Sequence, residues 1–90
     1  MSKTKIYKNQ GKIEYYDPIK LKAGVLSSCL AVQTPPAAAK NFADSVEKKV
    51  AKALKNQTAM TLRDLKRVAK KNLSLVHPDA AEVYAIEEEF

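Results

Sequence analysis

The 90-residue sequence contains one cysteine, one histidine, two glycines and no tryptophan. A single cysteine, Cys29, cannot form an internal disulfide, and with one histidine it does not give the ligand spacing of a structural zinc site. No apolar run approaches the roughly 20 residues of a membrane-spanning helix. The first ten residues lack the apolar segment of a secretory signal peptide. These absences predict a cytoplasmic protein without structural zinc, a transmembrane segment or a membrane partner.

Side chains suited to covalent catalysis are also scarce. Ser27, Ser28 and Cys29 lie on a helix-like segment that looks core-facing, and His77 lies far along the sequence. A nucleophile, a base and an orienting acid are not assembled convincingly from these residues. We therefore expect a protein that is not an enzyme, with Cys29 as a small buried side chain.

Charge is plentiful and mostly of one sign. The formal net charge is +6, and four of the ten acidic residues fall in the last nine positions, so residues 1–81 are strongly basic. This balance favours an anionic partner such as a nucleotide, a nucleic acid or an acidic protein surface, although it also serves solubility. At 46% hydrophobic and 29% charged residues, the composition indicates one small globular domain over residues 1–90.

The first elements are predicted by local composition. Residues 4–8 and 12–16 are rich in β-branched and aromatic side chains, and the segment 9–11 between them suits a hairpin turn whose glycine takes a positive φ. Asp17 is a good N-cap, and Pro18 suits the first position of a helix.

Apolar residues then recur at helical spacing in three further blocks. Thr34 is expected to cap the second helix, and Thr61 the third, while His77-Pro78 separates the third helix from a short fourth. Around residues 56–60 the pattern breaks and leaves room for a turn and a very short third strand. The predicted class is α+β, with a small N-terminal β-hairpin and a short third strand covering a cluster of four helices.

The tripeptide His77-Pro78-Asp79 follows a basic helical segment and resembles the motif of chaperone-stimulating J-domains. Eleven residues follow Asp79, fewer than that family's third helix and its flanking loop require. The N-terminal hairpin has no counterpart there either. We therefore interpret Pro78 as the residue that ends one helix and lets the next begin.

Lysine and arginine side chains lie on the outer sides of the second and third predicted helices. Lys66 and Lys70 are four residues apart, as are Arg67 and Lys71, so each pair shares one side of a helix. Such a surface suits nucleic acid, yet any surface helix presents a charged outer face. No aromatic residue is interleaved with these lysines, so base stacking is not indicated on the helices.

Residues 5–21 hold a more specific combination of charges. Ile6 and Lys8 share one face of the hairpin, and Lys20 lies in the first turn of the following helix. A hairpin packed on that helix would bring Lys8 and Lys20 together near the helix N-terminus, whose free N–H groups suit phosphate. The residues alone allow either an anion site or scattered surface charges.

A spaced set of residues in this stretch resembles the start of the ATP-cone, a regulatory nucleotide-binding domain of ribonucleotide reductases and of their zinc-ribbon transcriptional repressor. The Thr-capped third helix and a last helix of the type A-x-x-Y, here Ala81 and Tyr84, are also similar, and the resemblance covers nearly the whole chain. It implies an ATP-cone-like fold, in which a small sheet covers four helices. The N-terminal residues that carry it are Lys8, Gly11, Glu14, Tyr16, Asp17, Lys20 and Leu21.

The resemblance also implies a nucleotide site. Ile6 would line the base or sugar, and Lys8 would reach phosphate. Lys66 stands where the family commonly has His or Gln near the base. Asn9-Gln10 replaces the family's Arg-Asp, so a fork-shaped phosphate donor is missing, and Glu88 replaces a late arginine. The residues expected around the nucleotide or its magnesium are Ile6, Lys8, Asn9, Glu14, Asp17, Lys20, Leu62 and Lys66.

The resemblance therefore implies a stand-alone nucleotide-sensing module that binds ATP or dATP with magnesium. Without a zinc ribbon or a catalytic barrel, it would act through self-association or by docking on a ribonucleotide reductase or another protein. Two alternatives stay open. One is a degenerate cone that binds a protein instead of a nucleotide, as the loss of arginine at Asn9 indicates. The other is a basic nucleic-acid-binding domain, as the lysine-rich helices indicate.

Overall fold

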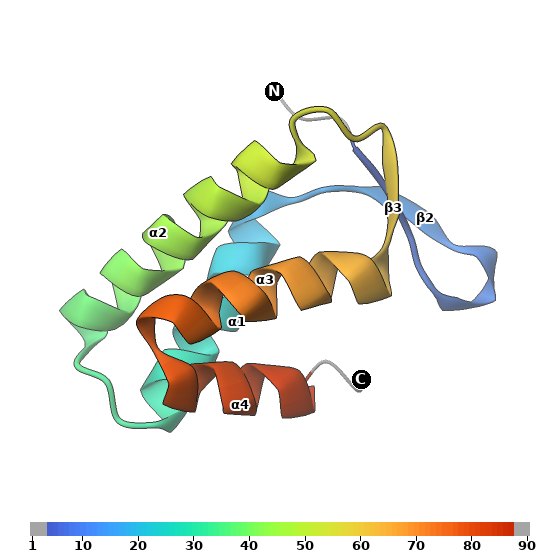
Figure 1. Ribbon diagram of the computed structural model, residues 1–90. Helices are drawn as coiled ribbons and strands as arrows, with labels where there is room; N and C mark the ends of the chain where they lie inside the picture. The colour runs from blue at the N-terminus through green and yellow to red at the C-terminus, as the bar shows by residue number, and fades with distance from the viewer. Residues whose placement is uncertain (1–3, 88–90) are drawn as a thin grey trace.

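Three short strands and four helices follow one another in the computed structural model, which describes residues 4–87 and, within these, the side chains of residues 4–84. The predicted α+β class is confirmed, with the sheet at one end of the helical cluster (Figure 1). None of the helices described has the length and apolar composition needed to cross a bilayer. The elements are β1 (Lys5–Tyr7), β2 (Ile13–Tyr15), α1 (Pro18–Ala31), α2 (Pro36–Leu54), β3 (Ala59–Thr61), α3 (Leu62–Val76) and α4 (Pro78–Glu87).

The sheet has the order β2-β1-β3 and is mixed. β1 pairs with β2 as an antiparallel hairpin and with β3 in parallel, so Ile6 lies between Glu14 and Met60. Ile6 is the one buried side chain of β1, with 2% of its surface exposed, whereas its two neighbours in the strand are exposed. The predicted hairpin and the predicted third strand are both present, and the third strand leads directly into α3.

The hairpin turn is a short 3₁₀ turn over Asn9–Gly11. The expected positive φ occurs at Gly11, with a value of 76°, and also at Gln10, with a value of 66°. A left-handed conformation is uncommon for a residue with a side chain. The Lys8 N–H donates to the Lys12 carbonyl at 2.7 Å and closes the turn.

Two helix starts form as the sequence predicts. The Asp17 carboxylate accepts from the Ile19 N–H at 2.9 Å, and Pro18 is the first residue of α1. The Thr61 hydroxyl accepts from the Asp64 N–H at 3.1 Å at the start of α3. Each cap satisfies a backbone donor that has no partner inside its helix.

The expectation that Thr34 caps α2 is wrong. The N-cap residue of α2 is Pro35, and no side chain caps this end. Pro35 and Pro36 lack N–H groups, so the helix start has fewer donors for a cap to satisfy. The Thr34 hydroxyl lies 2.7 Å from His77 Nε2 instead, and the His77 ring packs on Phe42 with centroids 5.1 Å apart. These contacts join the α1–α2 loop and α2 to the residue that follows α3.

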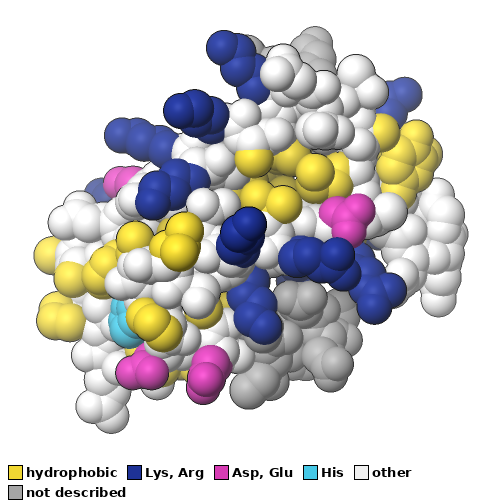
Figure 2. All heavy atoms as spheres, viewed as in Figure 1, with side chains coloured by type: hydrophobic (Ala, Val, Ile, Leu, Met, Phe, Trp, Pro, Cys, Tyr) yellow, Lys and Arg dark blue, Asp and Glu magenta, His cyan; other side chains and the backbone are white. Residues whose placement is uncertain are grey.

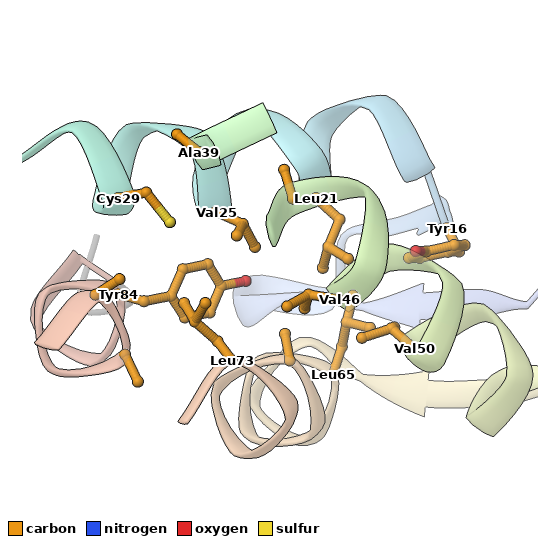
Figure 3. Packing of buried hydrophobic residues seen from close by; sticks show 14 of the residues in the cluster. Tyr16, Leu21, Val25, Cys29, Ala39, Val46, Val50, Leu65, Leu73 and Tyr84 are labelled. Carbon is orange, nitrogen blue, oxygen red and sulfur yellow. The ribbon is translucent and has the colours of Figure 1, made fainter. Parts of the chain in front are cut away.

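The hydrophobic core forms where the four helices meet. Side chains from all four point into one interior, as Figure 3 shows for Val25, Val46, Leu65, Leu73 and Tyr84. Cys29 is fully buried, as expected, and burial raises the pKa of its thiol. The helical spacing of apolar residues in the sequence includes Leu30 and predicts that Val76 faces inward, but both lie at helix ends and are exposed. The apolar spacing of the fourth helix also predicts that Ile86 faces the core, and this residue lies outside the described side chains.

Replacing a core leucine on α3 should cost far more stability than replacing an exposed one. Leu73 is fully buried, so Leu73→Ala should lower the free energy of unfolding by about 3 kcal/mol, through lost burial and the cavity left behind. Leu75, on the same helix, is 70% exposed, and Leu75→Ala should change the free energy by less than about 0.5 kcal/mol. Urea denaturation followed by circular dichroism measures both. Equal losses in the two variants would contradict the packing described here.

Candidate functional site

A cavity of about 400 Å³ lies between the sheet, the first half of α1, the start of α3 and Tyr84 of α4. This volume is within the range of small-molecule sites. Both charged and apolar side chains line it, and the charged ones come mainly from the hairpin and from the first turn of α1.

The carboxylate of Glu14 brings two lysines of the cavity together. Its Oε1 lies 3.4 Å from Lys8 Nζ, and its Oε2 lies 3.8 Å from Lys20 Nζ. The register explains this arrangement, because Glu14 opposes Ile6 on the inner face and Lys8 follows two residues later on the same face. The predicted meeting of Lys8 and Lys20 is therefore found. The three side chains are 36–70% exposed, so each ion pair contributes less than about 1 kcal/mol and is readily exchanged.

The N-terminus of α1 borders the cavity, but its donors are already used. Pro18 has no N–H, and the N–H groups of Ile19 and Lys20 donate to the Asp17 carboxylate. The Leu21 N–H donates to the Asp17 carbonyl at 3.2 Å. The expectation that free N–H groups at this helix end would hold phosphate is therefore wrong. The positively charged groups that line the cavity are those of Lys8, Lys20 and Lys66.

The floor of the cavity is apolar. Ile6, Leu21 and Leu65 are each at most 7% exposed and line it from three elements. Tyr84 of α4 also lines it and lies close to Gly24 of α1, where a Cβ would come within 3.3 Å of Tyr84 Cε1. The glycine therefore permits the close approach of the two helices. This floor suits a flat, apolar group.

A third lysine reaches the cavity from α3. Lys66 Nζ lies 5.7 Å from the centroid of the Tyr84 ring, within the range of a cation–π contact. Leu62, one turn earlier on the same helix, is half-buried and also lines the cavity. The cavity thus combines an apolar floor with ammonium groups from the hairpin, α1 and α3.

The structure brings most of the predicted site residues together. Asn9 is the exception, since it lies exposed in the hairpin turn and does not line the cavity. Tyr84, Gly24 and Leu65 line the cavity and were absent from the predicted set. A glycine inside a predicted helix was a signal of close approach, whereas the position of Tyr84 depends on how α4 packs. The predicted residues that line the cavity are Ile6, Lys8, Glu14, Asp17, Lys20, Leu62 and Lys66.

Tyr16 connects the cavity wall to α2. Its hydroxyl donates to Glu47 Oε2 at 2.9 Å, and its side chain is 7% exposed. Burial, followed by the hydrogen bond to Glu47 and the negative charge of Glu47, raises the pKa of Tyr16 well above its ordinary value. Tyr16 therefore stays a neutral donor at all ordinary pH values and holds the strand–helix junction on α2.

This raised pKa predicts a loss of stability at alkaline pH. Folding favours the protonated phenol, so the contribution is complete below the unfolded pKa of about 10 and is lost as the pH rises towards the folded value. The free energy of unfolding should therefore fall more steeply above pH 10 in the wild type than in Tyr16→Phe. At pH 7 the variant should be about 1–2 kcal/mol less stable because the bond to Glu47 is lost. Urea denaturation between pH 7 and 11 measures both effects. Parallel pH curves would contradict the assignment.

Comparison of the chain with models of known protein families and with curated protein sequences gave no match. Among the side chains of residues 4–84, no three His, Cys, Asp or Glu groups come together as a metal-ion site would require.

Proposed function

We propose that the cavity binds a nucleoside triphosphate, ATP or dATP with its magnesium, and that the chain is a nucleotide-sensing regulatory module. The observation that carries this proposal is the meeting of Lys8 and Lys20 on one carboxylate beside an apolar cavity of about 400 Å³. A charged rim next to an apolar floor is what a ligand with a polyphosphate and a flat base requires.

The phosphates would lie at the lysines. Lys8 and Lys20 have only Glu14 as an ion-pair partner among the described residues, and both ammonium groups are partly exposed. A triphosphate offers the two lysines several oxygens in place of the two that Glu14 provides. Its charge-assisted hydrogen bonds to the lysines would therefore contribute more binding free energy than is lost with the weak ion pairs.

The base would lie on the apolar floor formed by Ile6, Leu21 and Leu65. Tyr84 adds an aromatic surface on this side, and Lys66 lies over its ring. Burial of a flat ring here would favour binding by the hydrophobic effect. The same contacts do not distinguish ribose from deoxyribose.

The two carboxylates at the rim have roles that do not require them to bind the metal. Glu14 orders two lysines, and Asp17 caps α1. Magnesium would arrive bound to the phosphates, as is usual for nucleotides. In this arrangement Glu14 competes for the lysines with a triphosphate that carries no magnesium. Bound magnesium would reduce the repulsion between the Glu14 carboxylate and the phosphates.

A bound nucleotide would contact the hairpin, α1 and α3 at once, and it could therefore change how these elements present their surfaces. Such a module regulates only when the ligand has different affinities for two assembly states. We propose that the states differ in self-association or in docking on a protein such as a ribonucleotide reductase, in the cytoplasm.

Calorimetric titration of the protein with ATP and dATP in the presence of magnesium tests the proposal. Lys8→Ala and Lys20→Ala should each weaken binding about tenfold, because each removes a charge-assisted contact. Lys22→Ala is the matched control, since Lys22 lies on the same helix but pairs with Asp44 at 3.7 Å and does not line the cavity. Its affinity should be unchanged. Absence of heat, or equal affinities in all four proteins, would contradict a nucleotide site and favour a cone that binds protein alone.

Removal of the Glu14 charge should strengthen the binding of nucleotide in the absence of magnesium, whereas the lysine variants weaken binding. Glu14→Gln frees two lysines from weak ion pairs, so binding of ATP without magnesium should tighten about threefold. Asp44→Asn removes a carboxylate that pairs with Lys22 away from the cavity, and it should leave the affinity unchanged. The same calorimetric titration in the presence of a chelator measures both variants. A loss of affinity in Glu14→Gln would show that the carboxylate contacts the ligand favourably instead.

A further inference from the structure

The outer face of the small sheet is open to solvent. Each strand has three residues. The first and the last are exposed on the outer face, and only the middle residue points towards the helices. The register arranges the six outward side chains in two rows across the sheet. One row is Tyr15, Lys5 and Ala59, and the other is Ile13, Tyr7 and Thr61.

This face carries three large side chains that are partly exposed. Tyr7 is 42% exposed, Ile13 55% and Tyr15 61%. They are neighbours on adjacent strands, so they form one continuous apolar and aromatic patch. A contiguous exposed apolar patch is a candidate surface for binding a partner.

The two tyrosines are diagonal neighbours. Tyr7 lies opposite Ile13, and Tyr15 is two residues further along the same strand on the same face. Diagonal neighbours across an antiparallel pair have Cα atoms about 7–8 Å apart. Two aromatic side chains that project from the same face of adjacent strands can each accept one unstacked base of a single strand, because every base has a flat π-face.

The charge around the face favours an anionic partner. None of the six outward residues is acidic, Lys5 lies in the middle of one row, and Lys12 is exposed in the adjoining turn. The Glu14 carboxylate lies on the inner side with Lys8. Lysine and arginine side chains also extend along α2 and α3 (Figure 2), and the whole chain carries +6. A second copy of the same basic chain would meet like charge here, so charge complementarity favours a polyanion over self-pairing.

We propose that this outer face binds single-stranded nucleic acid, with two neighbouring bases stacked on Tyr7 and Tyr15 and the phosphates near Lys5 and Lys12. This surface differs from the lysine-rich helices and does not depend on the nucleotide proposal. Tyr15 also borders the cavity, so the two surfaces adjoin at the end of β2. Stacking carries no base-specific hydrogen bond, so binding has little sequence preference.

Fluorescence anisotropy with a labelled oligothymidylate of about 15 nucleotides, compared with a duplex of the same length, tests the proposal. The single strand should bind more tightly than the duplex. Tyr7→Ala and Tyr15→Ala should each weaken binding about tenfold, whereas Tyr7→Phe and Tyr15→Phe should keep it, because phenylalanine retains the ring. Tyr7→Leu and Tyr15→Leu, which keep apolar bulk without an aromatic ring, should lose affinity as the alanine variants do. They test the same point if an alanine variant does not fold.

Two further variants test the contribution of charge and serve as a control for the loss of an exposed apolar side chain. Lys5→Gln should weaken binding at low salt and reduce the salt dependence by about 0.7 in the slope of log K against log salt. Leu75→Ala, which removes an exposed apolar side chain from α3, should leave binding unchanged. The proposal is overturned if the oligonucleotide does not bind, if the duplex binds as tightly, or if the leucine variants bind as the wild type does.

Discussion

The burial of Ile6 is the constraint on which both proposed sites depend. Ile6 is the one side chain of β1 that enters the core, and strand side chains alternate with period two. Its burial therefore directs Lys8 to the inner side, beside Glu14, and leaves Lys5 and Tyr7 on the outer side. A register shift of one residue would turn Lys8 outward and bury Tyr7, so the cavity and the outer face would both be lost. Thr4 supports the same register, because its hydroxyl donates to the Gln57 carbonyl at 2.8 Å and so ties the start of β1 to the segment before β3.

The cavity is assembled from segments that are distant in the sequence, and different contacts hold each wall. The Asp17 cap fixes the start of α1, and the Tyr16–Glu47 bond holds the preceding residue on α2. Gly24 lets Tyr84 close the far side. The rim is held only by exposed ion pairs, which are weak. A well-fixed floor and an easily rearranged rim suit a site in which an incoming anion replaces an internal carboxylate.

Local chemistry made much of this structure predictable. The hairpin, the Asp17 and Thr61 caps and the helical spacing all depend on neighbours in the sequence, and these predictions were confirmed. The proximity of Lys8 and Lys20 could be predicted because only Tyr16 and Asp17 separate the hairpin from α1. The predictions that were wrong depended on tertiary contacts instead. Thr34 pairs with His77, which lies 43 residues away, and the α1 N–H groups are used by their own cap. The place of Tyr84 in the cavity depends on the packing of α4. The exposed patch of Tyr7, Ile13 and Tyr15 depends on the sheet order, because nothing in residues 4–84 covers the outer face of the sheet.

The central claim is that the Lys8–Glu14–Lys20 cluster and the apolar floor beneath it form one ligand site. The most direct test is a titration of isotopically labelled protein with magnesium ATP, followed by the amide shifts in NMR spectra. Saturable shifts centred on Lys8, Glu14, Lys20 and Lys66 are expected, with the exposed lysines of α2 unaffected. Shifts spread over the exposed lysines without saturation, or no shifts at the cavity, would contradict this claim.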